Sequence, residues 1–376
     1  MDQGAVGQAH EGAAPVPASA AVAASAPRGR RPRRSGLAFD LTALALVGVL
    51  LIGAVVAGAL SISQEFYSAR AFVERYLGLL AERRAADALA LPGVAVDSEE
   101  LAAAGIGDHA SDALLRQAAL TSLTDVKVLS EEEAGDLTHV TVSYVAGGYP
   151  GTTTFDVERD GWIGIAPAWR FATSPLAVID LTVRGSMKFD VNGFALDKRQ
   201  VSPDGVNAVA LAPLPMLVFS PGLYSVSVST AIATTPGVAV LSDSPLTAVP
   251  IDVQAQPTAQ FVEVVQERVD EFLTACAQQQ VLQPTACPFG YRLEDRVVSP
   301  PTWSIAQSPT ISVVPNGADW QIPATQAIAH IRVEVRSLFD GSLSEIDEDV
   351  AFDVSGTIEV LPDGTASIQV SGPGPS

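Results

Sequence analysis

The four histidines are the residues of this chain best suited to acid–base chemistry near neutral pH. A catalytic histidine needs a nucleophile or a partner group, and the sequence contains neither a G-x-S-x-G nor an S-x-x-K motif. His139 and His330 fall on predicted strands, at positions that face solvent or the polar side of a sheet. His10 lies in an N-terminal tail, and His109 lies in a loop beside Asp108. We therefore interpret all of them as structural or incidental, and we expect no catalytic residue.

An acidic run near the C-terminus offers the oxygen ligands that Ca²⁺ prefers. It comprises Glu345, Asp347, Glu348 and Asp349 and follows Asp340-Gly341. Its spacing does not match that of an EF-hand loop. We predict a solvated loop that leads into a strand, and we expect no metal site and no cofactor.

The chain has two cysteines, Cys276 and Cys287. Two are too few for a four-cysteine zinc site. Outside the cell, two cysteines this close in sequence more often form a disulfide than stay reduced. We predict a disulfide between them.

The compartment follows from the apolar segment Leu41–Leu60, which has twenty residues and no charge. A helix of that length spans ~30 Å, the thickness of a bilayer's hydrocarbon core. The stretch RGRRPRR precedes it, so the positive-inside rule places the N-terminus in the cytoplasm and residues 61–376 outside. A signal peptide cleaved near Ala57-Gly58-Ala59 is the alternative. We predict a transmembrane helix over residues 37–62 and a single-pass protein of the cell membrane.

Amino-acid composition differs between the parts before and after this segment. Residues 1–36 are rich in Ala, Pro, Gly and Ser, which predicts a disordered cytoplasmic tail. The net charge of the chain is −20, and it becomes −22 for residues 61–376 once the five arginines and three acidic residues before them are left out. Such a surface repels polyanions, so we expect no nucleic-acid partner.

Residues 64–175 begin with a helical pattern. Apolar residues recur at helical spacing from Phe66 to Leu80, and Pro92-Gly93 ends the pattern. A second short helix is predicted over Asp112–Leu120. Strands follow, as in the alternation of Val140–Tyr144.

Residues 176–255 contain no long helical pattern. Short alternating segments are separated by turn signals at Asn192-Gly193 and Pro221-Gly222. These features predict a small all-β module.

Residues 256–376 repeat the first order of elements. Apolar residues from Phe261 to Cys276 share one helical face, and Ile331–Val335 alternates as a strand. Turns are predicted at Ser355-Gly356 and at Pro362-Asp363-Gly364. A helix followed by antiparallel strands therefore occurs twice, which we interpret as a degenerate duplication within an α+β protein.

Three segments resemble known families. ARAFVERYLGLLAERRAADALAL resembles the opening helix of NTF2-like domains, in which a helix packs on a curved antiparallel sheet. FVEVVQERVDEFLTACAQQQVLQPTACPFGY resembles the C-terminal ectodomain of single-pass membrane proteins of Gram-positive bacteria, especially actinobacteria. KFDVNG and FSPGLYSVSV are similar to PEGA-type β modules. The overall plan resembles the teicoplanin-resistance-associated membrane proteins, although this chain lacks the cytoplasmic zinc ribbon with which those usually begin.

The resemblance implies two NTF2-like domains, at 64–175 and 256–376, that flank a small β-sandwich. NTF2-like folds often hold a pocket inside the curved sheet. Tyr144, Trp162 and Trp169 are the aromatic residues that we expect in such a pocket or in the core. We expect Trp303 and Trp320 to be packing residues.

These observations favour a membrane-anchored, extracytoplasmic binding or cell-envelope protein without catalytic activity. It would contact the membrane through Leu41–Leu60 and an envelope protein through its outer domains. The alternative is an exported enzyme or small-ligand carrier that uses an NTF2-like pocket.

Overall fold

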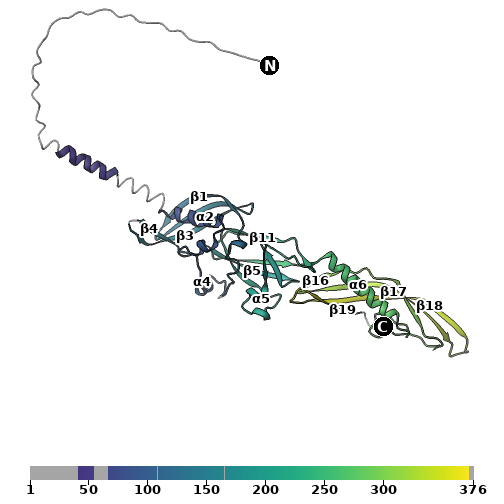
Figure 1. Ribbon diagram of the computed structural model, residues 1–376. Helices are drawn as coiled ribbons and strands as arrows, with labels where there is room; N and C mark the ends of the chain where they lie inside the picture. The colour runs from purple at the N-terminus through teal and green to yellow at the C-terminus, as the bar shows by residue number, and fades with distance from the viewer. Residues whose placement is uncertain (1–40, 55–66, 108, 165, 372–376) are drawn as a thin grey trace, which may run out of the picture. The chain divides into compact units, whose positions relative to one another are not determined.

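The computed structural model describes residues 41–54, 67–107, 109–164 and 166–371 (Figure 1). The chain divides into two compact units, Met1–Leu60 and Ser61–Ser376. In the first unit, residues 41–54 form a helix, which covers the beginning of the predicted span Leu41–Leu60. Residues 55–60 and the predicted tail lie outside the described residues. Over the parts that are described, no helix is long and apolar enough to cross a membrane.

The first described helix of the second unit is α2 (Ala69–Ala81). Its N-cap is Ser68, whose side chain accepts a hydrogen bond from the Ala71 N–H at 3.1 Å. The chain leaves the helix through Arg83, which has a left-handed φ of 59°. Two short helices follow, α3 (Ala85–Leu89) and α4 (Ser98–Ala103).

The helix predicted over Asp112–Leu120 is wrong, because only the 3₁₀ turn η1 (Gln117–Ala119) forms there. The backbone just before it pairs instead with β8 (Leu214–Phe219). The Ser111 N–H donates to the Pro215 carbonyl, and the Leu217 N–H donates to the Ser111 carbonyl, both at 2.8 Å. Tertiary pairing thus outweighs the local helical pattern.

A four-stranded antiparallel sheet packs against α2, in the order β1-β2-β3-β4. Its strands are β1 (Leu123–Ala134), β2 (Leu137–Ala146), β3 (Tyr149–Ile163) and β4 (Ala166–Phe171). Tyr76 of α2 meets Phe155 and Phe171 of the sheet, with ring centroids 5.9 and 5.1 Å away. These side chains are fully buried, so aromatic packing fills the space between helix and sheet.

The middle of the unit, which we call the middle module, consists mainly of strands and also contains the short helix α5 and the 3₁₀ turn η2. Two sheets, β11-β9-β6-β7 and β12-β5-β8, pack as a sandwich, with β12 parallel to β5. Strands β10 and β13 pair separately. The remaining elements are β5 (Leu176–Arg184), β6 (Lys188–Val191), β7 (Phe194–Asp197), α5 (Lys198–Val201), η2 (Gly205–Asn207), β9 (Gly222–Ser227), β10 (Ala233–Thr234), β11 (Val238–Ser242), β12 (Ala248–Gln254) and β13 (Gln256–Pro257). The predicted turn at Asn192-Gly193 is confirmed, since both residues have positive φ between β6 and β7.

The last part begins with α6 (Ala259–Ala277), capped by Thr258, whose side chain accepts from the Phe261 N–H at 3.2 Å. Its apolar face packs on a sheet whose centre is the long hairpin of β17 (Asp319–Arg336) and β18 (Leu343–Val360). Three short strands pair one after another along β17, and β19 (Ala366–Ser371) pairs with β18. The short strands are β14 (Arg296–Val297), β15 (Thr302–Gln307) and β16 (Val314–Asn316). They act as one interrupted strand, so this sheet and the first one share the same meander order after a helix.

Two sequence expectations for β18 are wrong. The acidic run Glu345–Asp349 is not a loop but part of this strand, paired with β17. Ser355-Gly356 is not a turn, because β18 continues through it to Val360. A Cβ on Gly356 would lie 2.6 Å from the Gln369 carbonyl oxygen of β19, so glycine here permits close approach of two strands.

The middle module shares its core with both neighbours. Leu176 and Val178 of β5 belong to the core of the α2 part, which we call the N-terminal core. Ala177 and Ile179, on the opposite face of β5, belong to a second core that continues through α6 to β17 and β18, which we call the central core. Every residue of Leu176–Ile179 is therefore buried.

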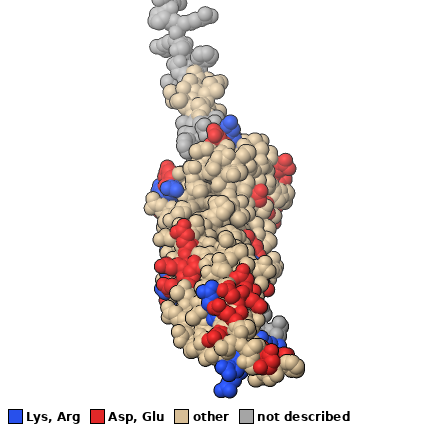
Figure 2. Space-filling view, turned by 90° about the vertical axis from the view of Figure 1, so that its right-hand side faces the viewer, with Lys and Arg blue, Asp and Glu red and all other residues tan. Residues whose placement is uncertain are grey.

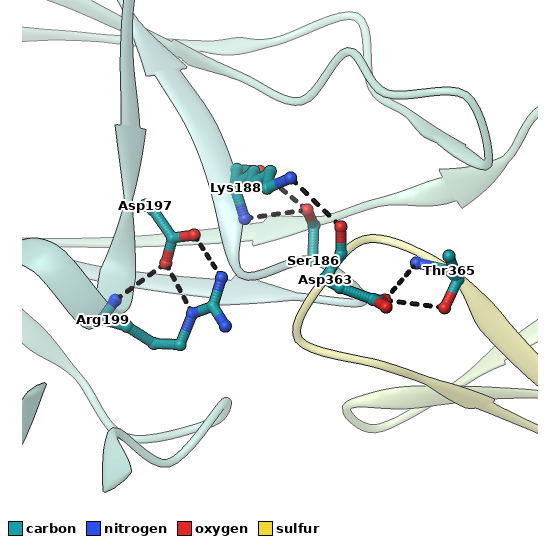
Figure 3. A network of polar contacts seen from close by, with 6 residues as sticks. All are labelled: Ser186, Lys188, Asp197, Arg199, Asp363 and Thr365. Atoms are coloured by element: carbon teal, nitrogen blue, oxygen red, sulfur yellow. Dashed lines mark hydrogen bonds and ion pairs between the residues drawn. The ribbon is translucent and has the colours of Figure 1, made fainter. Parts of the chain in front are cut away.

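Polar contacts reinforce the junction between the middle module and the last part (Figure 3). The ammonium group of Lys188 in β6 donates to the carbonyl oxygen of Asp363 at 3.1 Å. The Asp363 carboxylate accepts from the N–H and the hydroxyl of Thr365, which confirms the predicted turn between β18 and β19. Nearby, Asp197 binds Arg199 through both carboxylate oxygens.

Candidate functional site

The β17–β18 hairpin carries a ladder of charged residues on the face away from α6. Cross-strand partners on this face are His330 with Asp349, and Arg332 with Asp347. His330 Nδ1 lies 2.9 Å from Asp349, and His330 Nε2 lies 3.0 Å from Asp347. Arg332 donates to Asp347 at 2.6 Å, and this hydrogen bond lowers the pKa of the Asp347 carboxyl.

This ladder has the groups for acid–base chemistry but not the geometry of a catalytic site. Both ring nitrogens of His330 contact carboxylates, so neither faces a nucleophile or a cavity. Across the described part of the chain, no cluster of three or more His, Cys, Asp or Glu is arranged to hold a metal ion. Acidic side chains outnumber basic ones on the face shown in Figure 2.

The free end of the same hairpin carries exposed apolar side chains. Leu338, Phe339 and Leu343, which we call the hairpin tip, are 71%, 99% and 55% exposed. Val297 and Val298 of the neighbouring segment are also exposed. In Figure 1 this end of the hairpin lies at the opposite end of the Ser61–Ser376 unit from α2. Exposed apolar side chains gathered at one place are typical of an interaction site.

Hydrogen bonds hold the backbone of the tip in one conformation. The Ser337 N–H donates to the Ser342 carbonyl at 2.9 Å. Asp340 accepts from the N–H and the hydroxyl of Ser342, at 3.1 and 2.8 Å. The Leu338 N–H donates to Asp295 at 3.1 Å. These bonds order the backbone of the turn, while its apolar side chains contact solvent.

The predicted disulfide between Cys276 and Cys287 is present. It joins the end of α6 to the following loop, in which Phe289 packs 4.9 Å from Trp303 and 5.1 Å from Phe352 between ring centroids. Trp303 donates its indole N–H to the Val281 carbonyl at 2.8 Å. A disulfide is consistent with an extracytoplasmic location of this part of the chain.

His139 belongs to a different sheet from the hairpin. His139 lies on β2 and contacts Asp156 of β3 through Nδ1 at 2.6 Å, on a partly exposed sheet face. Its position and that of His330 confirm the prediction that they lie on polar sides of sheets. His109 lies in a loop, whereas His10 and Asp108 lie outside the described residues.

The aromatic residues expected in a pocket or in the core have three different environments. Tyr144 is 2% exposed and its hydroxyl lies 2.9 Å from the Thr153 hydroxyl, which itself donates to the Asp243 carbonyl. Tyr144 is therefore the donor, and burial raises its pKa. Trp169 donates its indole N–H to the Tyr67 carbonyl. Trp162 is 67% exposed, so the expectation that it lies in a pocket or core is wrong.

Trp303 and Trp320 are both buried, which confirms them as packing residues. Trp320 packs on Phe261 of α6, with ring centroids 5.4 Å apart.

A groove of about 750 Å³ runs along the outer side of α6. Gln266 forms part of its wall, where its amide accepts from the Ile311 N–H at 2.9 Å and donates to the Pro309 carbonyl at 3.0 Å. Carboxylates of Glu263, Glu267 and Glu271 line it. Helical periodicity in the sequence could have predicted that these side chains lie on one side of α6. The opposite wall at Ile311 depends on tertiary packing and could not be predicted in this way.

Lys198 is a residue that sequence reasoning missed. It is 3% exposed, and its ammonium group donates to the carbonyl oxygens of Ala210 and Ala212. Burial lowers its pKa. Nothing in the local sequence distinguishes it from an exposed lysine.

Comparison with known proteins gives no relative from which a role could be transferred: no family model, curated protein or solved structure matches the chain.

Proposed function

We propose that this chain is a membrane-anchored, extracytoplasmic binding protein without catalytic activity, and that its hairpin tip contacts another protein of the cell envelope. The observation that carries the proposal is the exposure of Leu338, Phe339 and Leu343 at the end of a hydrogen-bonded turn. Burying each of these side chains against a partner would stabilise the complex by about 1.5–3 kcal/mol. A rigid turn presents them with little entropy left to lose on binding.

The anchor in this proposal is Leu41–Leu60, with the N-terminus in the cytoplasm. The apolar sequence of this segment and the arginines before it support the assignment. The disulfide at the other end of the chain supports the extracytoplasmic location of the binding part.

The same proposal assigns NTF2-like folds, related by duplication, to both α+β parts. Their shared element order, a helix followed by a meander of antiparallel strands, supports this assignment. In the first part, the buried rings of Tyr76, Phe155 and Phe171 fill the space between α2 and the sheet. That packing favours a binding role over turnover.

A small-ligand carrier is the second candidate, and the groove along α6 is the observation that favours it. Its volume is in the range of pockets that hold drug-sized ligands. We rank it second because eight of its ten lining residues come from α6 and a ninth is the C-cap of that helix, so it encloses a ligand poorly.

Site-specific crosslinking in intact cells tests the main proposal. A photoreactive phenylalanine analogue in place of Phe339 should give an adduct with a defined envelope protein. The same analogue in place of Val206, which is 83% exposed on the middle module, is the matched control and should not give that adduct.

The double variant Leu338→Ser/Phe339→Ser should weaken the complex at least roughly 100-fold, because two apolar side chains no longer become buried. An adduct pattern identical at the two positions would count against the tip as a binding site. Turnover that a single substitution at His109 or Tyr144 abolishes without unfolding would show instead that the protein is an enzyme.

A further inference from the structure

Among the residues that the structure describes, part of the outer edge of β18 has no partner strand. β18 pairs with β17 from Leu343 to Ile358, with one register shift between Ile322 and Thr325 of β17. On its other side, β19 pairs only with Ser355–Val360. Within the described parts of the chain, no strand pairs with the outer edge of residues 343–354.

The hydrogen-bond alternation identifies which backbone groups face that edge. The bond from the Ser337 N–H to the Ser342 carbonyl closes the hairpin, so even-numbered residues of β18 direct their N–H and C=O groups toward β17. The bond from the Leu361 N–H to the Thr365 carbonyl sets the same alternation on the other side, where odd-numbered residues face β19. Along the unpaired stretch, the residues with outward backbone groups are Leu343, Glu345, Asp347, Asp349, Ala351 and Asp353.

All charged side chains of β18 are acidic. Residues 343–360 contain no lysine or arginine, and they include carboxylates at Glu345, Asp347, Glu348, Asp349 and Asp353. Arg332 and His330 on β17 pair with three of the four carboxylates on the face of β18 away from α6, Glu345, Asp347 and Asp349. Asp353 lies opposite the neutral Gln326.

We propose that the free edge of β18 takes an extended, basic segment of a partner protein by β-strand addition. Outward N–H and C=O groups would bind the backbone of the segment, and the carboxylates would select lysine or arginine at alternate positions. This inference rests on the proposed function, since it names the chemistry of the partner that the adjoining hairpin tip contacts.

Charge argues against a second copy of this chain as the occupant. Antiparallel pairing of two β18 edges would place carboxylates opposite carboxylates, and like charges directly opposite each other destabilise a sheet. Acidic side chains on an edge strand thereby block self-association and leave the edge open to a segment of opposite charge.

A synthetic peptide of four Lys-Thr repeats is the probe, with four Glu-Thr repeats as its control. We expect the basic peptide to bind the full-length chain in detergent, as followed by fluorescence anisotropy, and the acidic peptide not to bind. Amide hydrogen exchange should slow at the odd-numbered residues from Leu343 to Asp353, and the effect should weaken as salt is added.

Ala351 provides a backbone test, because its side chain is exposed and its N–H faces the free edge. Ala351→Pro removes that N–H and places a ring in the path of the added strand, while the ladder to β17 stays intact. It should weaken peptide binding at least ~10-fold, whereas Ala351→Thr, which keeps the N–H, should change binding less than ~2-fold. The charge variant Glu345→Gln/Asp353→Asn should weaken it about 3- to 10-fold, and Glu131→Gln/Glu133→Gln on β1 should have no effect.

Equal binding to the proline and threonine variants would overturn the inference, as would exchange protection away from β18 in the unsubstituted protein. Dimers that Ala351→Pro dissociates would identify a second copy as the occupant and would also overturn it. Crosslinks at Phe339 that persist in Ala351→Pro would leave the proposed function standing while the inference fails. Slower amide exchange at the free edge of β18 without any Phe339 adduct would support this inference, while the proposed contact through the hairpin tip would fail.

Discussion

Replacing Asn192 should destabilise the junction between the first two parts of the Ser61–Ser376 unit. The loss should exceed that caused by replacing any single exposed polar residue. Its side-chain amide donates to the carbonyls of Ala119 and Leu223, at 2.7 and 2.8 Å. Its side-chain oxygen accepts from the Ser225 N–H at 2.8 Å. The residue also has a φ of 53°, a left-handed conformation that asparagine adopts more readily than alanine.

The magnitude follows from these contacts. Each of the three hydrogen bonds contributes about 1 kcal/mol to the free energy of unfolding, and alanine at this φ adds roughly 1 kcal/mol of strain. Asn192→Ala should therefore cost about 4 kcal/mol. Asn192→Gly loses the same bonds without the strain and should cost about 3 kcal/mol, because glycine adopts positive φ freely.

Denaturant unfolding of the full-length chain in detergent, followed by tryptophan fluorescence, measures these differences. Asn207→Ala, at an exposed position of the middle module, is the control and should change the free energy by less than about 0.5 kcal/mol. Losses below about 1 kcal/mol for both Asn192 variants would refute the reasoning, because they would mean that water replaces all three bonds. If the alanine and glycine variants are equally stable, the strain contribution is refuted, while the hydrogen-bond contribution stands.

Three further predictions concern other contacts. Replacing both Cys276 and Cys287 by alanine should lower the free energy of unfolding by about 3 kcal/mol, because the unfolded chain gains the freedom of an 11-residue separation; thiol titration that finds two free cysteines in the native protein would contradict this. The hydrogen bond from Arg199 lowers the pKa of Asp197, so the stability that it contributes is fully present above the ordinary aspartate pKa of ~3.9 and is lost as pH falls through the lower folded-state pKa. The cost of Asp197→Asn should accordingly be constant between about pH 5 and 7 and shrink below about pH 4, and a cost that does not shrink in acid would contradict the pairing. Lys198→Met leaves two carbonyls of the 202–213 loop without their donor, so limited proteolysis should cut that loop several times faster, while unchanged cleavage would show that the ammonium group does not hold it.

Local patterns predicted the elements whose periodicity is strong. The alternation around Ile331–Val335 lies in β17, and the helical face from Phe261 to Cys276 is α6. Asn192-Gly193 could be recognised as a turn because few dipeptides adopt two consecutive positive φ values. The two cysteines could be paired because they are close in sequence and no others compete.

The features missed from the sequence depend on distant neighbours. A glycine within a strand pattern has the same local signal as a turn, and only the approach of β19 explains Gly356. The acidic residues Glu345–Asp349 lie in a strand because Arg332 and His330 face them across the sheet. The free edge of β18 could not be predicted, since the length of β19 and its register decide which residues stay unpaired.

The middle module also determines how the Ser61–Ser376 unit comes apart. β5 contributes one face to the N-terminal core and the other to the central core, so neither neighbour can unfold without exposing buried side chains of the strand that they share. Cooperative melting should therefore extend across both junctions, at 175/176 and 255/256, and calorimetry should show one transition in place of three. A protease that cuts at either junction would not release a stably folded domain, because each fragment would expose core residues that pack on the other fragment. The boundaries predicted from the sequence therefore separate parts of the chain that do not fold independently.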